Sequence, residues 1–356
     1  MKLKVMAVGL FLFSCLYTVN AQKFVNGSEL ELIGKMFPDE PGYSRLDTTK
    51  WPDLPDPVKS LLQHSAGLAL SFSTNSNKIS AKWCVGGAGA LNNMTPIGQK
   101  GLDLYIRRNG KWEYAGVGRP KDKCSSYTLI ENMEDGWKEC LVYLPLYDEL
   151  KSIEIGIDED AQIRKHLDPF KKRILVYGSS IVHGASAARP GIAYPARLSR
   201  NTGYHFINFG VSGSAKMEAS VAKLIASVQA DIYVLDCVPN SNPEVITERT
   251  ANLVKTIRAA HPNAPIVMIE SIVRESGNFD TKIAAFESQK NINFKIEYEK
   301  LIAEGVKGLY YIEGKDLIGH DHEGTTDGIH PNDLGFDRMV QIIEPVMRKV
   351  IAEIEK

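Results

Sequence analysis

The sequence predicts an α/β protein in which an antiparallel β-sandwich, jelly-roll-like in its strand pattern, precedes a three-layer α/β/α domain. Two observations predict this order. Short alternating strands separated by turns fill residues 22–165, and apolar runs alternating with helical patterns fill residues 166–356. A third observation, the composition of residues 1–21, predicts a signal peptide in front of both. We therefore expect a signal peptide and two domains with these boundaries.

The first residues have the three regions of a secretory signal. Met1-Lys2-Leu3-Lys4 is basic, residues 5–16 are apolar but too few to span a bilayer, and Val19-Asn20-Ala21 is a small-residue cleavage pattern. Cleavage after Ala21 predicts a periplasmic or secreted protein. A lipoprotein anchored at Cys15 is the weaker alternative, because Phe13 fits a lipobox poorly. No later segment is long and apolar enough to predict an integral membrane segment after signal removal.

Charge and cysteine content limit the possible partners and sites. The 356 residues carry a net charge of −1, so no electrostatic attraction to nucleic acid or to an anionic membrane is expected. No pair of cysteines has the close spacing of a zinc site. An exported chain permits disulfides; Cys124 with Cys140 is the one pairing we consider, and the sequence leaves the pairing open. Cys237 ends an apolar run and is expected to be a buried free thiol.

The first half has the period of half-buried strands. Apolar and polar residues alternate at 68–73, 79–83, 102–106 and 153–157, and turn signals lie at 75–77, 109–110 and 134–136. No helical stretch is expected between these strands. Short alternating strands of this kind are typical of a sandwich or jelly roll.

The second half alternates between strand and helix. Apolar runs occur at residues 174–177, 206–209, 232–235, 266–269 and 309–312, and the clearest helical patterns cover residues 215–229, 243–260 and 333–354. Continuous apolar strands joined by helical crossovers predict a buried parallel sheet with helices on both faces. The carboxyl ends of such strands meet at one edge, where ligands bind.

Chemically active side chains follow these strands. Ser180 comes after the first apolar run, Gly213 lies in the turn after the second, and Asn240 follows the third. Asp327 and His330 lie three residues apart in a loop before the last helix. This set predicts a nucleophile (Ser180), a base (His330) and a carboxylate that orients it (Asp327). The backbone N–H groups of Ser180 and Gly213 and the Asn240 side chain would form an oxyanion hole.

The order of these residues resembles the SGNH (GDSL-type) hydrolase family. The resemblance covers about residues 170–350 and implies a flavodoxin-like strand order, with Ser180, Gly213, Asn240 and the pair Asp327/His330 at the family positions. The sequence departs from the family pattern in two places. Ser179 replaces the usual Asp before the nucleophile, and Val238-Pro239 replaces Gly-Gly before Asn240.

Each of the other motifs has both a functional and a structural interpretation. Gly101-Leu102-Asp103-Leu104-Tyr105 resembles the GxDLY signature of a small domain in front of some exported SGNH hydrolases, but it also reads as an ordinary alternating strand. His183 and Arg189 would either reach the substrate or lie on a helix surface. His320-Asp321-His322-Glu323 has metal-binding side chains, but such a run is more often a solvated loop, and we expect no metal.

These observations predict an exported serine esterase that needs no cofactor. The resemblance implies a carbohydrate esterase, and we expect it to remove acetyl groups from a polysaccharide or oligosaccharide, so that its partner is an acylated carbohydrate or another small ester. Two alternatives stay open. One is a short-chain lipase or acyl-esterase acting on non-carbohydrate esters; the other is a glycan-binding protein whose hydrolase domain is silent.

Overall fold

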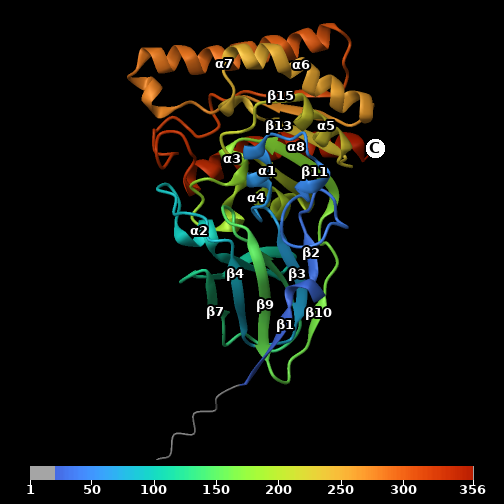
Figure 1. Ribbon diagram of the computed structural model, residues 1–356, viewed down its shortest axis with the longest axis vertical. Helices are drawn as coiled ribbons and strands as arrows, with labels where there is room; N and C mark the ends of the chain where they lie inside the picture. Colours follow the sequence, from blue (N-terminus) through green and yellow to red (C-terminus); the bar gives the residue numbers. More distant parts are fainter. Residues whose placement is uncertain (1–20, 356) are drawn as a thin grey trace, which may run out of the picture.

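The computed structural model describes residues 21–355, which form two stacked parts (Figure 1). The N-terminal β-sheets lie at one end of the long axis, and the α/β domain lies at the other. The predicted signal peptide and the alternative lipid anchor at Cys15 fall on residues 1–20 and lie outside the described residues. Within residues 21–355, no helix is both long enough and apolar enough to cross a membrane.

The N-terminal part consists of two antiparallel sheets, as the alternating pattern predicts. The first sheet has the order β1-β9-β4-β7, and the second has the order β10-β3-β8-β5-β6 with β2 paired to β3. The strands are β1 (Gln22–Asn26), β2 (Glu31–Ile33), β3 (Ala69–Thr74), β4 (Ile79–Val85), β5 (Leu102–Arg108), β6 (Lys111–Gly118), β7 (Cys124–Ile130), β8 (Lys138–Tyr143), β9 (Leu150–Asp158) and β10 (Ile163–Lys165).

The two sheets enclose one hydrophobic core. Alternate residues of each strand enter it, as Leu70 and Phe72 of β3 and Ala81 and Trp83 of β4 do. A second, smaller cluster lies on the other face of the β3-β8-β5 sheet, where residues such as Tyr105 pack with residues of the α/β domain. This sheet is therefore buried on both faces, which explains the nearly continuous burial of β3 and β8.

The structure contains one disulfide within residues 21–355. Cys84 on β4 lies directly opposite Cys124 on β7, and these two residues form it. The candidate bond between Cys124 and Cys140 is wrong, because Cys140 lies on β8 in the other sheet, buried as a free thiol. Cys237 is a buried free thiol, as predicted.

The α/β domain is built on a five-stranded parallel sheet with the order β12-β11-β13-β14-β15, which is the flavodoxin-like order. Its strands are β11 (Lys171–Gly178), β12 (Tyr204–Gly210), β13 (Ile232–Asp236), β14 (Ile266–Ile269) and β15 (Leu309–Ile312). The α-helices within residues 21–355 are α1 (Asp56–Leu62), α2 (Pro96–Lys100), α3 (Ser180–His183), α4 (Tyr194–Thr202), α5 (Ala219–Ser227), α6 (Pro243–Ala260), α7 (Thr281–Ala303) and α8 (Asp333–Ile354).

Alternation along β11 separates the two helical layers. Leu175 and Tyr177 join the core shared with α5, α6 and α7, whereas Ile174 and Val176 join the core shared with α4 and α8. Each face of the sheet therefore carries its own layer of helices. This confirms the predicted three-layer α/β/α fold and the sandwich in front of it.

Some elements depart from the expected pattern. A short helix, α2, interrupts the first half between β4 and β5, where only strands and turns were expected. A segment before residue 68 also packs against the α/β domain, although the strands that follow it in the sequence belong to the N-terminal sheets. Met36, Leu46 and Val58 of this segment lie in the core of the α/β domain. In Figure 1, α1 accordingly sits among the α/β elements.

The GxDLY motif forms hydrogen bonds between the N-terminal part and the α/β domain. The buried carboxylate of Asp103 accepts two hydrogen bonds from Arg189 Nη1, at 2.9 and 2.7 Å, and one from the backbone N–H of Gly191, at 2.8 Å. The hydroxyl oxygen of Tyr105 accepts a further hydrogen bond from Arg189 at 2.5 Å, and the Arg200 guanidinium lies over the Tyr105 ring. Asp103 and Tyr105 therefore do more than continue a strand: they bind the hydrolase half.

Candidate active site

Ser180 lies where β11 passes into α3 at the carboxyl edge of the sheet. Ser179 caps α3, since its Oγ accepts a hydrogen bond from the N–H of Ile181 at 3.2 Å. This is the role that the short oxygen-bearing residue before the nucleophile can fill, whether Asp or Ser. Glycine is needed at position 178 because the backbone of Asp236 lies very close: a Cβ at position 178 would be 2.3 Å from the carbonyl oxygen of Asp236.

A hydrogen-bonded chain joins the three residues predicted to be catalytic. Ser180 Oγ lies 2.9 Å from His330 Nε2, and His330 Nδ1 lies 2.7 Å from Asp327 Oδ2. Ser180 is only 7% exposed, and the His330 side chain is 20% exposed. The geometry is that of a nucleophile, a base and an orienting carboxylate. Their catalytic roles remain predictions.

The local turn fixes the Asp327 carboxylate. Its Oδ1 accepts hydrogen bonds from the backbone N–H groups of Ile329 and His330, at 3.1 and 2.8 Å. Burial alone would raise the pKa of Asp327, but the hydrogen bonds from the backbone and ring of His330 outweigh it, and the pKa lies below its usual value. Asp327 is therefore a carboxylate at neutral pH, as an orienting group must be.

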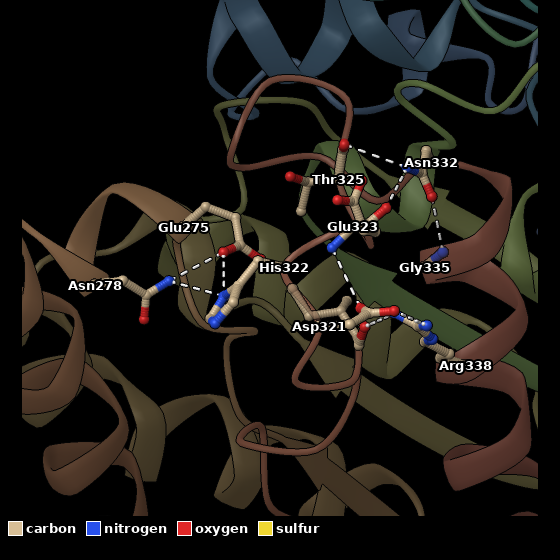
Figure 2. A network of polar contacts seen from close by, with 10 residues as sticks. Glu275, Asn278, Asp321, His322, Glu323, Thr325, Asn332, Gly335 and Arg338 are labelled. Atoms are coloured by element: carbon tan, nitrogen blue, oxygen red, sulfur yellow. Dashed lines mark hydrogen bonds and ion pairs between the residues drawn. The ribbon is translucent and has the colours of Figure 1, made fainter.

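Polar contacts hold the loop that carries this pair (Figure 2). On one side, His322 Nδ1 lies 2.9 Å from Glu275 Oε2 and 3.1 Å from Asn278 Nδ2. On the other side, Arg338 of α8 donates two hydrogen bonds of 2.6 Å to Asp321.

Asn332 holds the end of the same loop through hydrogen bonds. Its Nδ2 donates to the carbonyl oxygens of Glu323 and Thr325, at 2.7 and 3.2 Å, and its Oδ1 accepts from the N–H of Gly335 and so caps α8. The loop is thus tied to α8 as well as to the segment of Glu275 and Asn278. Hydrogen bonds at both ends of the loop limit the motion of His330 relative to Ser180.

The predicted oxyanion-hole residues lie at the ends of the two strands that flank β11. Gly213 follows β12 and has a φ of +71°, a backbone conformation that favours glycine. Asn240 follows β13, and its Oδ1 accepts a hydrogen bond of 3.3 Å from the N–H of Ala215. This bond ties Asn240 to the Gly213 turn and leaves its Nδ2 hydrogens for another acceptor. The oxyanion role itself remains a prediction.

Asn93 is a site residue that the sequence analysis missed. It comes from the loop between β4 and α2 in the N-terminal part, yet its Nδ2 lies 3.1 Å from Asp327 Oδ2 and 3.2 Å from His330 Nδ1. No motif in this loop marks it as functional, and only the packing of the two parts brings it to the pair.

Asp236 is a second overlooked group, at the end of β13 beside the nucleophile turn. It is 2% exposed, its Oδ2 accepts a hydrogen bond from the Tyr194 hydroxyl at 2.9 Å, and its backbone oxygen accepts from the N–H of Ser179. Burial raises the pKa of Asp236 to about 7, against the opposing effect of the Tyr194 hydrogen bond.

We expect Asp236→Asn to stabilise the protein in a pH-dependent way. The folded protein holds this proton more tightly than the unfolded chain, so the wild-type free energy of unfolding falls as pH rises from about 4 to about 7. Asn keeps a polar partner for Tyr194 without the charge. The variant should gain roughly 2–4 kcal/mol at about pH 8 and little at about pH 4, measured by urea denaturation. The exposed Asp160→Asn should show no such trend, and equal gains at both pH values would contradict the expectation.

Neither His183 nor Arg189 has a free side chain of the kind expected for a substrate contact. His183 is fully buried, and its Nε2 hydrogen-bonds the carbonyl oxygen of Leu146 at 2.7 Å. Burial, with the Arg45 and His64 side chains nearby, lowers its pKa well below the usual value. Arg189 binds Asp103, as described above. Both residues are structural.

The run from His320 to Glu323 does not converge on one point. His320 contacts Asp316, while Asp321 and His322 bind Arg338 and Glu275. Within residues 21–355, no group of three or more His, Cys, Asp or Glu side chains is arranged to hold a metal ion.

Two models of known sequence families match the chain, one in each part. The sequence model described as "GDSL-like Lipase/Acylhydrolase family" matches residues 171–348, and the one described as "N-terminus of Esterase_SGNH_hydro-type" (GxDLY) matches residues 22–163. Among curated proteins, no sequence match is found.

Solved structures resemble the whole chain. A protein assigned as a GDSL-like lipase from Bacteroides ovatus is 50% identical, with a TM-score of 0.91, over 93% of this chain and 98% of that one. The salicylyl-acyltransferase SsfX3 from a tetracycline biosynthetic pathway is 19% identical, with a TM-score of 0.72, over 94% and 98%. The acetyl xylan esterase Est2A from the rumen bacterium Butyrivibrio proteoclasticus is 11% identical, with a TM-score of 0.61, over 93% and 99%.

Proposed function

Because this chain belongs to the GDSL-like lipase/acylhydrolase family, and is therefore an esterase or acylhydrolase, we propose that it is an exported serine esterase that removes acetyl groups from carbohydrate. The single observation that carries the proposal is the hydrogen-bonded chain from Ser180 through His330 to Asp327. It supplies the groups that ester hydrolysis requires without a cofactor.

The mechanism follows from this chain. Ser180 Oγ attacks the ester carbonyl carbon while His330 Nε2 takes its proton, and Asp327 stabilises the imidazolium. The N–H groups of Ser180 and Gly213 and the amide of Asn240 hold the oxyanion of the tetrahedral intermediate. His330 then protonates the leaving alcohol, which departs from an acyl-enzyme. Water, deprotonated by His330, then attacks the acyl carbonyl; the bond to Ser180 Oγ breaks, His330 returns the proton to that oxygen, and the acid departs.

The carbohydrate substrate rests on a likeness of architecture. A solved structure with the same two-part architecture carries the description acetyl xylan esterase. The acyltransferase SsfX3 shares the architecture too and favours a second candidate, transfer of the acyl group to an alcohol instead of water.

Acyl length tests the acetyl preference against a lipase activity. We expect acetyl esters to be hydrolysed faster than butyryl and longer p-nitrophenyl esters, and acetate to be released from acetylated polysaccharide. A hydrophobic acyl tunnel would instead gain about 0.8 kcal/mol for each buried methylene, roughly fourfold per carbon. Values of kcat/KM that increase with acyl length up to the octanoyl ester would refute the acetyl proposal. Product analysis with an added alcohol separates hydrolysis from transfer.

Asn93→Ala tests whether the N-terminal part positions the catalytic pair. A hydrogen bond to a charged group contributes about 1.5–3 kcal/mol, so we expect kcat to fall roughly 10- to 100-fold with little change in KM. If Asn93 acts through the carboxylate, the same substitution should cost far less in an Asp327→Asn background. Leu91→Ala, an exposed neighbour in the same loop, is the control. Additive losses in the double variant would indicate a merely structural role.

Export is the other part of the proposal. The Cys84–Cys124 disulfide supports it, since such bonds persist in oxidising compartments. Fractionation of cells expressing the full chain, with sequencing of the mature N-terminus, tests the predicted cleavage after Ala21. Recovery of uncleaved protein in the cytoplasm would contradict it.

A further inference from the structure

Arg45 carries a positive charge into the α/β domain from the segment before residue 68. Its side chain is only 1% exposed, and burial lowers its pKa to about 9, which leaves the guanidinium protonated at neutral pH. Within residues 21–355 its hydrogen bonds go to backbone carbonyls and one side-chain amide, not to a carboxylate. A buried charge is costly unless such bonds replace its hydration, so these partners fix where the guanidinium lies.

The guanidinium joins two segments that are far apart in the sequence. On one side, its Nε and Nη2 donate hydrogen bonds to the carbonyl oxygens of His64 and Leu61, at 3.0 and 2.6 Å. On the other side, its Nη1 donates to the carbonyl oxygen of Gly210 at 2.7 Å and to Asn208 Oδ1 at 3.3 Å. Arg45 therefore holds the end of β12 against the N-terminal part.

Asn208 connects this end of β12 to the helix of the nucleophile. Its Nδ2 donates to the carbonyl oxygen of Val182 in α3 at 2.6 Å, and its Oδ1 accepts from the N–H of Gly210 at 2.9 Å. The strand and the helix lie very close, since a Cβ at position 210 would be 2.1 Å from the backbone nitrogen of His183. Because α3 begins with Ser180, the end of β12 and the nucleophile are positioned together.

The same strand end leads into the Gly213 turn. Gly210 is the last residue of β12, and Gly213 follows it with a φ of +71°. The N–H of Ser214 donates to the carbonyl oxygen of Val211 at 2.9 Å and closes the turn. The two backbone N–H groups assigned to the oxyanion hole, those of Ser180 and Gly213, therefore belong to the two segments that this strand end joins.

We propose that Arg45 is a positioning residue for the oxyanion hole, because it holds the end of β12 so that the N–H groups of Ser180 and Gly213 point to one site. The proposal rests on the esterase function above and extends it to a residue of the N-terminal part. Donors of an oxyanion hole stabilise the transition state only when they are fixed in advance, since a small displacement weakens their bonds to the developing charge.

Arg45→Lys tests the proposal, because Lys keeps the charge but lacks the planar fork of donors that spans both segments. We expect kcat on p-nitrophenyl acetate to fall roughly 10- to 100-fold with little change in KM. The corresponding thionoacetate locates the loss. Sulfur is a larger atom and a weaker hydrogen-bond acceptor than oxygen, so a well-placed oxyanion hole favours the oxygen ester. The ratio of kcat on the oxygen ester to kcat on the thiono ester should therefore fall in the variant.

Arg258→Lys is the matched control. Arg258 also donates to backbone carbonyl oxygens, among them those of Ala264 at 2.7 Å and Lys307 at 2.8 Å. These two residues lie just before β14 and β15, at the edge of the parallel sheet opposite Ser180. Both substitutions should lower the midpoint of urea denaturation, but Arg258→Lys should leave kcat and the ratio between the two esters unchanged.

If Arg45→Lys does not fold, Asn208→Asp takes its place. This variant keeps an oxygen for Arg45 but loses the donor to Val182, and we expect the same fall in kcat and in the ratio.

The outcomes separate this proposal from the esterase function. A folded variant that keeps the wild-type kcat, or that loses rate equally on both esters, would overturn the positioning role. A wild-type enzyme with no preference for the oxygen ester would overturn it too. Absence of wild-type turnover on p-nitrophenyl acetate would instead refute the proposed function on which the positioning role depends.

Discussion

Ser180→Ala is expected to abolish esterase turnover, with a loss on the order of 10⁵- to 10⁶-fold in kcat, whereas Ser179→Ala should retain a readily measurable rate. Of these two serines, Ser180 is the one whose Oγ contacts His330 Nε2, so its hydroxyl can transfer a proton to the base as it attacks. Ser179 is buried, and its Oγ is occupied as the cap of α3. Rates on p-nitrophenyl acetate measure the difference.

The Ser179 variant is the matched control, since it removes a neighbouring hydroxyl of the same kind. Losing the cap should lower its free energy of unfolding by about 1 kcal/mol without removing catalysis. Labelling with a covalent organophosphate, followed by peptide mapping, identifies the nucleophile directly. A label on Ser179, or a Ser180→Ala enzyme that still turns over, would show the assignment to be wrong.

The second large effect concerns stability. Arg189→Ala should lower the free energy of unfolding by roughly 3–5 kcal/mol, because the fully buried Asp103 carboxylate loses the guanidinium that donates to both of its oxygens. Burial already raises the pKa of Asp103, with Arg189 and Arg200 opposing the rise. Without Arg189 the carboxyl should bind a proton more readily, so the loss should be largest near neutral pH and smaller in acid.

An exposed ion pair provides the control for this prediction. Arg107 contacts Glu139 at 3.0 Å, but both side chains are more than one third exposed, so Arg107→Ala should cost less than about 1 kcal/mol. Urea denaturation of both variants at several pH values measures the effects. If Arg189→Ala costs no more than Arg107→Ala, the contact between Asp103 and Arg189 does not stabilise the junction of the two parts.

Elements with strong local signals could be located from the sequence alone. The predicted helices at 243–260 and 333–354 match α6 and α8, and each begins after an Asn whose side chain caps it. The predicted strands at 266–269 and 309–312 likewise match β14 and β15. Capping and continuous burial are properties of neighbouring residues, so these bounds are encoded locally.

Elements shaped by distant contacts were predicted less well. The helix expected at 215–229 is confined to Ala219–Ser227, because Met217 has a φ of +56° and so cannot belong to a right-handed helix. The N–H of Ala215 donates to Asn240, and that of Met217 donates to the Tyr177 hydroxyl. The long helix α7 lacked a clear signal, since apolar side chains such as Phe286 and Ile296 remain exposed on it.

The three-layer fold and the sandwich in front of it follow from strand period and turns, and the spacing of Ser180, Gly213, Asn240, Asp327 and His330 marks the candidate site. The contacts between residues far apart in the chain could be learned only from the folded protein. Strand register placed Cys84 opposite Cys124, and the docking of the two parts brought Asn93 to Asp327 and Asp103 to Arg189. These partners are far apart in sequence, and no local pattern records a contact that exists only after both parts have folded.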